Sequence, residues 1–382
     1  MIIQIKTRYK NFFYIMYKNL IYIADFSLPN MSAYMLHVLK MCDAFSEKKY
    51  NVRLLVPYKK KDLNYRTLKK KYLLKKNFVI NSFFKNKIKR GFFTYLIYSF
   101  KIYNDLKNKE KNSLIISRSI LPALILNILG LKTILEVHTE LRGLTKIIFI
   151  ILKYLISIDK FKFILIHSNL NNKLVLQKKQ FIVLDDCVDL RDFSFKAKKK
   201  NQCAYTGSFV KGKGVEIIVK ISKKLPNVKF NLYGNKKTLN SSLHNEIRNS
   251  KNIVLNNYVT YNRIPMILKS NKILLMPYEK EAGVLIDDLD VSSYISPLKL
   301  FDYLASGSII IASRKKAYDH ILKNSYNCFL INSFNEDEWS KKIVKIMNNK
   351  FKSNKISINS IKTAKKFSWL DRCQKILKFA NK

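Results

Sequence analysis

Three short segments of the sequence combine residue types that bind phosphate and hydroxyl groups. The clearest is residues 294–313, YISPLKLFDYLASGSIIIAS. Within it, Ser296 suits the N-cap of a helix, Pro297 the first helical position and Gly307 the C-terminal cap. The segment therefore predicts a helix with well-defined ends, followed by a buried strand.

The start of this predicted helix offers groups that bind an anion. Free backbone N–H groups around Leu298 and Lys299, together with the helix dipole, favour a phosphate, and the Lys299 side chain adds a positive charge. Asp302, one turn further on, can accept hydrogen bonds from two vicinal hydroxyl groups. A surface ion pair between Lys299 and Asp302 accounts for the same residues without any ligand. Both interpretations stay open at this point.

A second segment, residues 205–214 (YTGSFVKGKG), predicts a strand followed by a basic, glycine-rich loop. Its glycines, Gly207 among them, let the backbone come close to a ligand beside Ser208, and Lys211 and Lys213 supply cations. The loop lacks the G-x-x-x-x-G-K-[ST] pattern of a Walker A motif. A plain turn is the alternative to a phosphate-binding loop.

The third segment places an acid and an imidazole at the end of an apolar strand. In residues 133–140 (TILEVHTE), Glu136 and His138 fall where a parallel strand reaches its carboxyl end, and we expect both to face a ligand cleft. A satisfied structural histidine is the alternative. Pro29 and Asn30, in the loop after the first predicted strand, are expected to face the same cleft and to contact an acceptor.

One further loop concentrates acidic residues in a chain that has few of them. Residues 279–290, EKEAGVLIDDLD, carry five carboxylates interrupted by an apolar stretch. A mobile cleft loop, a divalent metal site and an acceptor-recognition loop are the three interpretations. We favour the first, because no candidate histidine ligand is close in the sequence.

These segments must be positioned by an alternation of short apolar runs and helical patterns, which predicts parallel sheets in an α/β fold. The predicted strands of the first half are Leu20–Ala24, Val52–Val56, Phe78–Ile80, Leu114–Ser117, Thr133–Val137 and Phe163–His167. Those of the second half are Ala204–Tyr205, Lys229–Tyr233, Ile253–Leu255, Ile273–Met276, Ile309–Ala312 and Phe329–Ile331. We expect two Rossmann-like domains that face each other across a ligand-binding cleft.

Charge and composition set the expected domain boundaries. The charged run at residues 196–200 (KAKKK) suits a linker, so residues 1–195 are predicted to bind an acceptor and residues 196–361 a donor. Residues 362–382 are predicted to form a final helix that crosses back to the first domain. The lysine-rich stretch 58–90 has weak periodicity and is expected to be an exposed insertion or loop.

Composition also excludes several classes of protein. The 382 residues are 48% hydrophobic, which rules out a disordered chain. Seventy-two Lys and Arg against 26 Asp and Glu give a formal charge of +46, but the lysines are scattered among many Ile, Asn, Phe and Tyr. This pattern is typical of coding sequence that drifts toward A and T. With no recognised motif and no basic aromatic platform, we do not expect nucleic acid as a partner.

The expected compartment is the cytoplasm. Five widely separated cysteines, none in a C-x-x-C pattern, indicate neither a zinc site nor a disulfide framework. Residues 1–15 lack the pattern of a signal peptide, and we expect Met16 to be the natural start of the protein, because Leu20–Ala24 reads as the opening strand of a domain. Two segments, 92–103 (FFTYLIYSFKIY) and 144–158 (LTKIIFIILKYLISI), combine apolar bulk with lysines, as helices at an anionic membrane surface do. Buried helices of the first domain are the alternative.

Several segments together resemble nucleotide-sugar glycosyltransferases of the GT-B fold, in particular the retaining family 4. Residues 296–313 resemble the segment around the second acid of that family's E-x7-E motif, and 205–235 resemble its glycine and lysine stretch. Residues 27–45 (SLPNMSAYMLHVLKMCDAF) are similar to the start of the acceptor domain in relatives that build surface polysaccharides. Residues 366–377 (KFSWLDRCQKIL) look like the closing helix. The likeness runs from about Leu20 to Phe379.

The resemblance also implies roles for individual residues. Lys213 matches the lysine that binds the donor diphosphate, Asp302 the acid that binds the ribose, and His138 the histidine that approaches the transferred sugar. Tyr294 stands where the family has its first acid. Ser208 replaces a frequent arginine, whose cation we expect Lys211 to supply.

The resemblance thus implies sugar transfer from a nucleotide diphosphate sugar to a lipid-linked or cell-surface glycan, with retention of configuration and no required metal or other cofactor. Lipopolysaccharide and other polysaccharide synthesis are the expected settings, with the enzyme resting peripherally on the inner face of the plasma membrane. A nucleotide-sugar epimerase on the same fold is the alternative. It requires a cleft carboxylate as base, for which Glu136 and Asp302 are the candidates.

Overall fold

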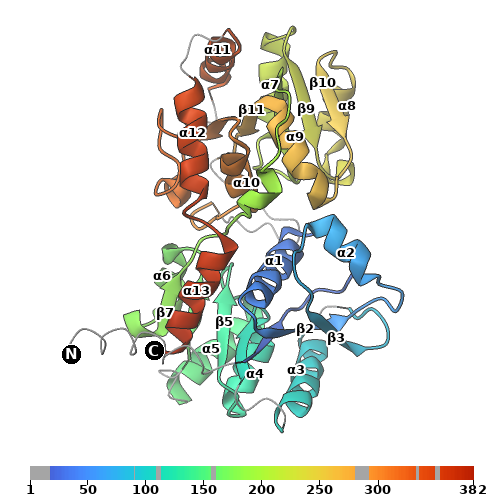
Figure 1. The fold of residues 1–382 in the computed structure, drawn as a ribbon, viewed down its shortest axis with the longest axis vertical. Helices are drawn as coiled ribbons and strands as arrows, with labels where there is room; N and C mark the ends of the chain where they lie inside the picture. The colour runs from blue at the N-terminus through green and yellow to red at the C-terminus, as the bar shows by residue number, and fades with distance from the viewer. Residues whose placement is uncertain are drawn as a thin grey trace, which may run out of the picture. The chain divides into compact units, whose positions relative to one another are not determined.

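The computed structural model describes residues 18–89, 91–108, 113–155, 161–279, 292–332, 335–348 and 353–382 (Figure 1). The chain forms two compact units, one of Met1–Leu184 with Trp369–Lys382 and one of Asp185–Ser368. The sequence placed these boundaries at 195/196 and 361/362 instead. The acidic loop lies outside the described residues, apart from Glu279.

The first unit is built on a parallel sheet with the strand order β3-β2-β1-β4-β5-β6-β7. The strands are β1 Asn19–Ile23, β2 Asn51–Tyr58, β3 Val79–Phe84, β4 Ser113–Ser117, β5 Thr133–Val137, β6 Phe163–Leu165 and β7 Phe181–Val183. The chain order runs outward in both directions from the neighbours β1 and β4. This doubly wound arrangement confirms the predicted fold class.

The helices of the first unit follow the strands in alternation. They are α1 Ala33–Glu47, α2 Tyr65–Tyr72, α3 Phe92–Leu106, α4 Ile120–Ile128, α5 Gly143–Leu155, α6 Asn171–Leu174 and α13 Trp369–Ala380. The last of these comes from the far end of the sequence and packs against α1. Ser32 caps α1 by accepting a hydrogen bond from the Met35 N–H at 3.2 Å.

The prediction that residues 58–90 form an exposed loop is wrong for part of the stretch. It contains α2 and β3, and β3 pairs in parallel with β2. Leu68, Tyr72 and Ile80 are buried, because α2 turns its few apolar side chains inward. The helical spacing of Leu68 and Tyr72 could not be recognised in the sequence, because lysines fill the positions between them.

The second unit repeats the architecture with the strand order β10-β9-β8-β11-β12-β13, again with every pair parallel. The strands are β8 Lys200–Thr206, β9 Lys229–Tyr233, β10 Ile253–Asn256, β11 Asn271–Met276, β12 Ile309–Ser313 and β13 Phe329–Ile331. The helices are α7 Val215–Lys224, α8 Ser241–Arg248, α9 Ile264–Ser270, α10 Leu298–Ser306, α11 Glu336–Met347 and α12 Ser353–Ala364.

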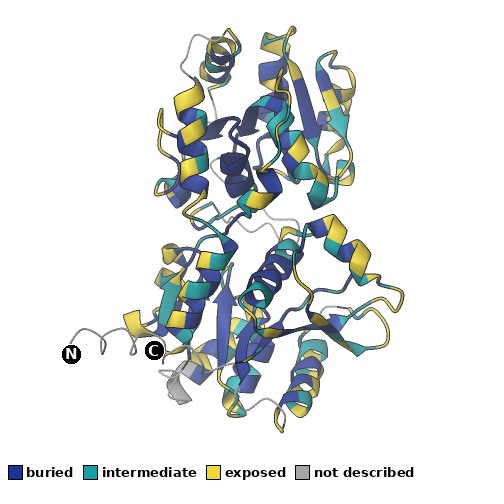
Figure 2. Cartoon of the chain, viewed as in Figure 1, coloured by how far each residue is buried: buried dark blue, intermediate teal, exposed yellow. Residues whose placement is uncertain are grey.

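Both faces of this second sheet are buried, as the dark blue strands of Figure 2 show. On β11, Ile273 and Leu275 belong to one apolar cluster, and their neighbours Leu274 and Met276 belong to another. Successive strand residues point to opposite faces, so helices must cover the sheet on both sides. A continuous apolar run such as ILLM is therefore the expected sequence of a central strand.

Helix α10 departs from its predicted start by one position. Pro297, not Ser296, is the N-cap residue, so the prediction that Ser296 caps the helix is wrong. Gly307 is the C-cap with a left-handed φ of 64°, which confirms its predicted role. Among the helices of the described ranges, none is long and apolar enough to span a bilayer.

Candidate active site

The candidate donor site of the second unit lies at the point of the sheet where the strand order reverses. Strands β8 and β11 are neighbours, and the chain leaves them toward opposite edges of the sheet. Ligands of doubly wound folds bind at this switch point, at the carboxyl ends of the strands. The loop 207–214 follows β8, and Pro277–Glu279 follow β11.

Two glycines allow the backbone to pack closely at this point. A Cβ atom at Gly207, where φ is 143°, would lie 2.6 Å from the Lys299 Nζ atom. A Cβ at Gly214, the N-cap of α7 with a φ of 78°, would lie 1.7 Å from the Pro277 carbonyl oxygen. The loop after β8 is thus fixed against the end of β11, and Lys299 reaches it from α10.

The ammonium group of Lys299 is buried between aromatic rings. Its Nζ atom lies 3.9 Å from the ring centroid of Tyr205 and 5.2 Å from that of Tyr278. This nitrogen is buried and has no hydrogen-bond partner among the residues that the structure describes. Burial, and secondly the nearby charge of Lys213, hold the pKa of Lys299 well below its usual range.

Lys213 lies at the same place, whereas Lys211 does not. The Lys213 side chain is buried, with its Nζ atom 5.0 Å from the Tyr278 ring centroid. Both Lys213 and Lys299 therefore stack on Tyr278. Lys211 is exposed on the loop, and no cation–π contact joins it to this described group. The structure brings two of the three predicted cations together.

Asp302 is buried one turn into α10 and is bonded to a tyrosine. The Tyr261 hydroxyl donates a hydrogen bond of 2.9 Å to the Oδ1 atom of Asp302. The described residues contain no ion pair between Lys299 and Asp302, so that alternative is wrong. The Tyr261 hydroxyl holds the Asp302 carboxylate in a fixed orientation.

The remaining predicted donor residues border this group. Ser296 accepts a hydrogen bond of 3.2 Å from the Asp186 N–H. The Ser208 carbonyl accepts one of 2.7 Å from the Tyr205 hydroxyl. Pro297 and Leu298 are half-buried at the start of α10. The backbone that we predicted to face a phosphate therefore forms the N-terminal end of this helix. Tyr294 is buried at the position of the family's first acid.

The predicted site residues of the first unit are more deeply enclosed than expected. Glu136 at the end of β5 is only 2% exposed, so the prediction that its carboxylate faces a cleft is wrong. Because β5 is buried along its whole length, side chains at its end are shielded from solvent even when they are charged. His138 lies two residues further on, and its side chain retains 16% exposure.

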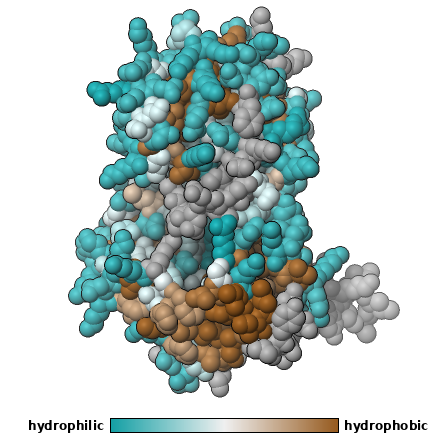
Figure 3. All heavy atoms as spheres, turned by 180° about the vertical axis from the view of Figure 1, so that it is seen from behind, coloured by the Kyte–Doolittle hydropathy of each residue, from teal (hydrophilic) through white to brown (hydrophobic). Residues whose placement is uncertain are grey.

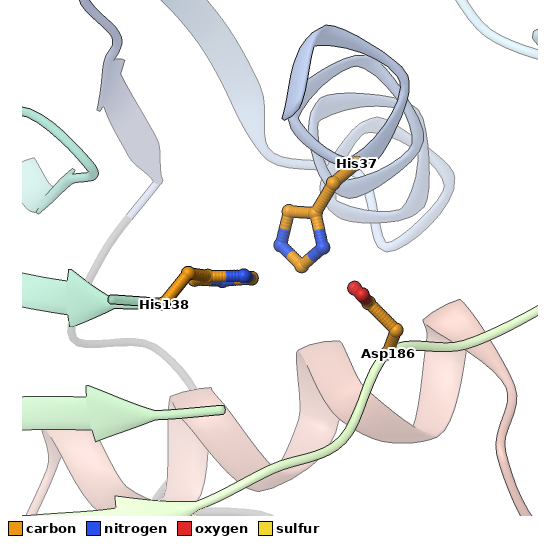
Figure 4. Close-up of side chains that lie close together, drawn as sticks. All are labelled: His37, His138 and Asp186. Atoms are coloured by element: carbon orange, nitrogen blue, oxygen red, sulfur yellow. The ribbon is translucent and has the colours of Figure 1, made fainter. Parts of the chain in front are cut away.

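The Glu136 carboxylate is surrounded by four polar side chains. Its Oε1 atom lies 2.8 Å from His37 Nε2, 2.9 Å from His138 Nε2 and 2.6 Å from an Arg372 Nη atom. The Tyr22 hydroxyl donates to its Oε2 atom. These partners come from α1, the end of β5, α13 and β1 respectively. Figure 4 shows His37 projecting from α1 toward the His138 ring.

Electrostatics fix the charge states in this cluster. Burial alone would raise the pKa of Glu136, but His37, Arg372 and the hydrogen bonds hold that pKa well below its usual range. Burial, and then the nearby charge of Arg118, lower the pKa of His138 to about 3. At neutral pH, Glu136 is therefore a carboxylate and His138 a neutral imidazole.

Pro29 and Asn30 lie in the loop between β1 and α1, as predicted. Pro29 is exposed, while Asn30 is half-buried. The Asn30 side-chain oxygen accepts a hydrogen bond of 2.8 Å from the Ser32 N–H, and its carbonyl accepts one of 3.0 Å from the Tyr72 hydroxyl. Asn30 shapes this loop, and Pro29 keeps a free surface.

Sequence reasoning missed the aromatic and distant members of both groups. In the second unit these are Tyr205, Tyr261 and Tyr278, and in the first unit Tyr22, His37 and Arg372. Tyr205 and Tyr278 lie at or just after the carboxyl ends of β8 and β11. This position is the one feature of the sequence from which they could have been predicted as site residues. His37 sits among apolar residues of an amphipathic helix, and Arg372 is 236 positions from its partner Glu136.

Comparison with known proteins gives this geometry a family context. Residues 189–363, nearly the whole second unit, match the family model described as Glycosyl transferases group 1. A search of curated proteins found no match.

Solved structures match almost the full chain at low identity, which shows the fold. A glycosyltransferase from Rickettsia africae ESF-5 has a TM-score of 0.71 at 11% identity, with 95% of this chain and 98% of that chain covered. Anabaena Alr3699/HepE in complex with UDP-glucose has 0.70 at 10%, covering 95% and 99%. WaaG, a glycosyltransferase involved in lipopolysaccharide biosynthesis, has 0.64 at 11%, covering 94% and 98%.

Residues 189–363 are therefore a Glycosyl transferases group 1 domain, and this domain together with the two-sheet GT-B fold identifies the chain as a glycosyltransferase.

Proposed function

We propose that this glycosyltransferase takes its sugar from a nucleoside diphosphate sugar and passes it to a lipid-linked or cell-surface glycan. The resemblance to the retaining family 4 supports retention of configuration and a reaction that needs no metal. The complex of HepE with UDP-glucose supports the donor class. The role of WaaG in lipopolysaccharide biosynthesis supports the acceptor class.

The observation that carries the proposal is the buried ammonium of Lys299. A buried cation without a hydrogen-bond partner is costly, and an anion that enters the site removes much of that cost. Lys213 stacks on the same Tyr278 ring, so the site offers two cations to one ligand. A diphosphate matches two cations and the free N–H groups at the start of α10.

The same arrangement suits catalysis of sugar transfer. As the bond between the sugar and the diphosphate breaks, negative charge grows on the leaving diphosphate. Lys213 and Lys299 are fixed in advance by their aromatic neighbours, so they stabilise that charge without reorganising. Asp302, oriented by Tyr261, is proposed to accept hydrogen bonds from the ribose hydroxyls. His138 is proposed to accept one from the transferred sugar.

Nucleotide binding tests this function directly. We expect UDP, GDP or ADP to raise the melting temperature of the purified protein, because a ligand that binds only the folded state stabilises it. Calorimetry with the same nucleotides should give a dissociation constant. A folded protein that binds none of the three, and that neither transfers nor hydrolyses any of their sugar derivatives, would overturn the proposal.

The geometry does not favour the epimerase alternative. That reaction needs a carboxylate able to take a proton from the sugar, and both candidates are engaged. Glu136 is enclosed by four polar side chains, and Asp302 accepts a hydrogen bond from Tyr261. Product analysis by mass and NMR with and without an acceptor separates the two reactions.

We further propose that the first unit rests on an anionic membrane. Helices α3, α4 and α5 carry apolar side chains that are at least 41% exposed, and Figure 3 shows them gathered in one brown patch. The exposed large apolar side chains described on these helices are Phe93, Ile97, Phe100, Ile128, Leu144, Ile147, Ile150 and Ile151. The alternative that both predicted segments are wholly buried is wrong, because α5 buries Phe149 and Leu152 and exposes its other face.

The charges around this patch support an anionic membrane as the partner. Lys89, Lys101, Lys107, Arg142 and Lys146 are exposed on or beside α3 and α5. Asp105, the acid of α3, is paired with Arg53 at 2.7 Å. An apolar face bordered by exposed lysines matches a bilayer with anionic headgroups.

Removing the apolar side chains of α5 is expected to weaken membrane binding. The variant Leu144→Ser/Ile147→Ser/Ile151→Ser should bind vesicles of anionic lipid at least ~10-fold more weakly, since each exposed side chain contributes about 1 kcal/mol or more when inserted. Vesicle sedimentation measures the change. The matched control is Val254→Ser/Met266→Ser, two exposed apolar residues of the second unit. Equal binding of wild type and the triple variant, or of wild type to neutral and anionic vesicles, would contradict the proposal.

A further inference from the structure

The buried carboxylate of Glu136 joins four elements of the first unit around one histidine. Its Oε1 atom contacts His37, His138 and Arg372, each within 2.9 Å, and its Oε2 atom accepts from Tyr22. Glu136 is only 2% exposed, so it contacts no substrate itself. An acid that is sealed from solvent but bonded to a partly exposed histidine acts through that histidine.

The carboxylate determines which nitrogen of His138 carries the proton. An ionised carboxylate only accepts hydrogen bonds, so the His138 Nε2 atom, 2.9 Å away, must be the protonated nitrogen. His138 is neutral, and its Nδ1 atom is therefore left with a lone pair. Among the described residues, nothing donates a hydrogen bond to Nδ1. The side chain is 16% exposed, so a ligand can reach it.

We propose that Glu136 is a positioning residue that fixes His138 in the Nε2–H tautomer, so that Nδ1 accepts a hydrogen bond from a hydroxyl group of the transferred sugar. The inference rests on the proposed function and deepens it, because it specifies what His138 presents to the sugar. The opposite tautomer would present an N–H donor at the same place, which a hydroxyl would meet through its oxygen. Carboxylates behind catalytic or metal-binding histidines act in this way.

The C-terminal helix α13 completes this arrangement. Arg372 of α13 donates to Glu136 at 2.6 Å and also bonds to the Leu184 carbonyl. Trp369, at the start of α13, packs edge to face on His37, with centroids 5.1 Å apart. His37 in turn packs edge to face on His138, with centroids 4.8 Å apart and an interplanar angle of 85°. The helix therefore supports both the charge of Glu136 and the plane of the His138 ring.

NMR of the full chain labelled with ¹⁵N in its histidine rings tests the tautomer. In the wild type we expect the His138 signals to show a protonated Nε2 and an unprotonated Nδ1 at neutral pH, with His138→Asn used to assign them. In Glu136→Gln the amide can either donate or accept, so we expect a mixture of tautomers. Asp105→Asn, which removes another arginine-paired carboxylate of the same unit, should leave the His138 signals unchanged.

Kinetics test whether the tautomer serves the sugar. We expect Glu136→Gln to lower kcat by roughly 10- to 100-fold, as losses of such supporting carboxylates do, while the dissociation constant for the free nucleoside diphosphate stays within about twofold. If Glu136→Gln folds poorly, the double variant Glu136→Gln/Arg372→Met removes the unpaired cation as well and gives the same readouts.

The outcomes separate this inference from the proposed function. A wild-type His138 protonated on Nδ1, or a folded Glu136→Gln protein with an unchanged tautomer and unchanged kcat, would overturn the inference while transferase activity remains. An absence of nucleotide binding would overturn the proposed function, and the NMR result would still report the tautomer. An equal loss of nucleotide affinity and kcat would indicate a general structural role and also overturn the inference.

Discussion

Lys299→Met is expected to lower kcat/KM for sugar transfer by about 10²- to 10³-fold, the loss typical when one fixed group that stabilises transition-state charge is removed. The substitution keeps most of the volume of the side chain between Tyr205 and Tyr278 and removes its charge. The affinity for a nucleoside diphosphate should fall as well, since Lys213 alone remains to face the diphosphate. Initial rates and calorimetry measure the two effects.

The same substitution should leave the protein at least as stable as the wild type. Burial and the nearby Lys213 depress the pKa of Lys299, and a lysine whose pKa is lower in the folded state destabilises that state at any pH below its unfolded pKa of about 10.4. Methionine carries no such charge. Loss of activity together with equal or higher stability is the signature of a residue kept for function rather than for folding.

Lys272→Met is the matched control for Lys299→Met. Lys272 lies on β11 in the same unit, but its Nζ atom donates a hydrogen bond of 3.2 Å to the Met347 carbonyl. We expect this variant to be slightly less stable and fully active. If Lys299→Met retains wild-type kcat/KM and nucleotide affinity, or if it loses activity only because it unfolds at lower temperature, Lys299 does not serve the diphosphate.

The parts of the molecule predicted well from the sequence are those set by local rules. Helix α10 is bounded by Pro297 and Gly307, whose backbone preferences act within one turn. The central strands are continuous apolar runs because helices cover both faces of the sheet. The backbone of the loop after β8 follows from its glycines, three of which take φ values that other residues rarely adopt.

The candidate sites depend on contacts between distant residues, which no local pattern encodes. Lys299 was predicted to bind a phosphate, but the two tyrosines that enclose it come from β8 and from the end of β11. Glu136 looked like a cleft residue because an acid at a strand end is usually solvated. Its burial is tolerated because partners from distant segments surround it, among them Arg372 from the other end of the chain, and neither sequence neighbourhood reveals the other.

Arg372→Met is expected to destabilise the first unit by about 3 to 5 kcal/mol, the usual loss when one partner of a buried ion pair is removed. Arg372 and Glu136 are both almost fully buried and lie 2.6 Å apart. Without the guanidinium, the Glu136 carboxylate stays buried, with only the Tyr22 hydroxyl and two histidine rings of the described residues in contact with it. Urea unfolding followed by circular dichroism, or hydrogen exchange of the β5 amides, measures the loss.

The control variants separate the charge effect from a packing effect. The double variant Arg372→Met/Glu136→Gln removes both charges and should recover most of the lost stability. Arg191→Met breaks a pair with Asp189 in which the arginine is 51% exposed, and it should lose less than about 1 kcal/mol. If the double variant is as unstable as Arg372→Met, the loss comes from packing of α13 and not from the stranded carboxylate.

The pH dependence of the Arg372→Met effect provides the sharpest check on this cause. In the wild type the pKa of Glu136 lies well below its usual range, so the carboxylate stays ionised in the folded protein between pH 7 and pH 5. In Arg372→Met, burial without the arginine raises that pKa, and protonation on acidification relieves the buried charge. The stability difference between wild type and variant should therefore shrink as the pH falls from 7 to 5. A difference that is constant or grows over this range would show that the charge of Glu136 is not what Arg372 stabilises.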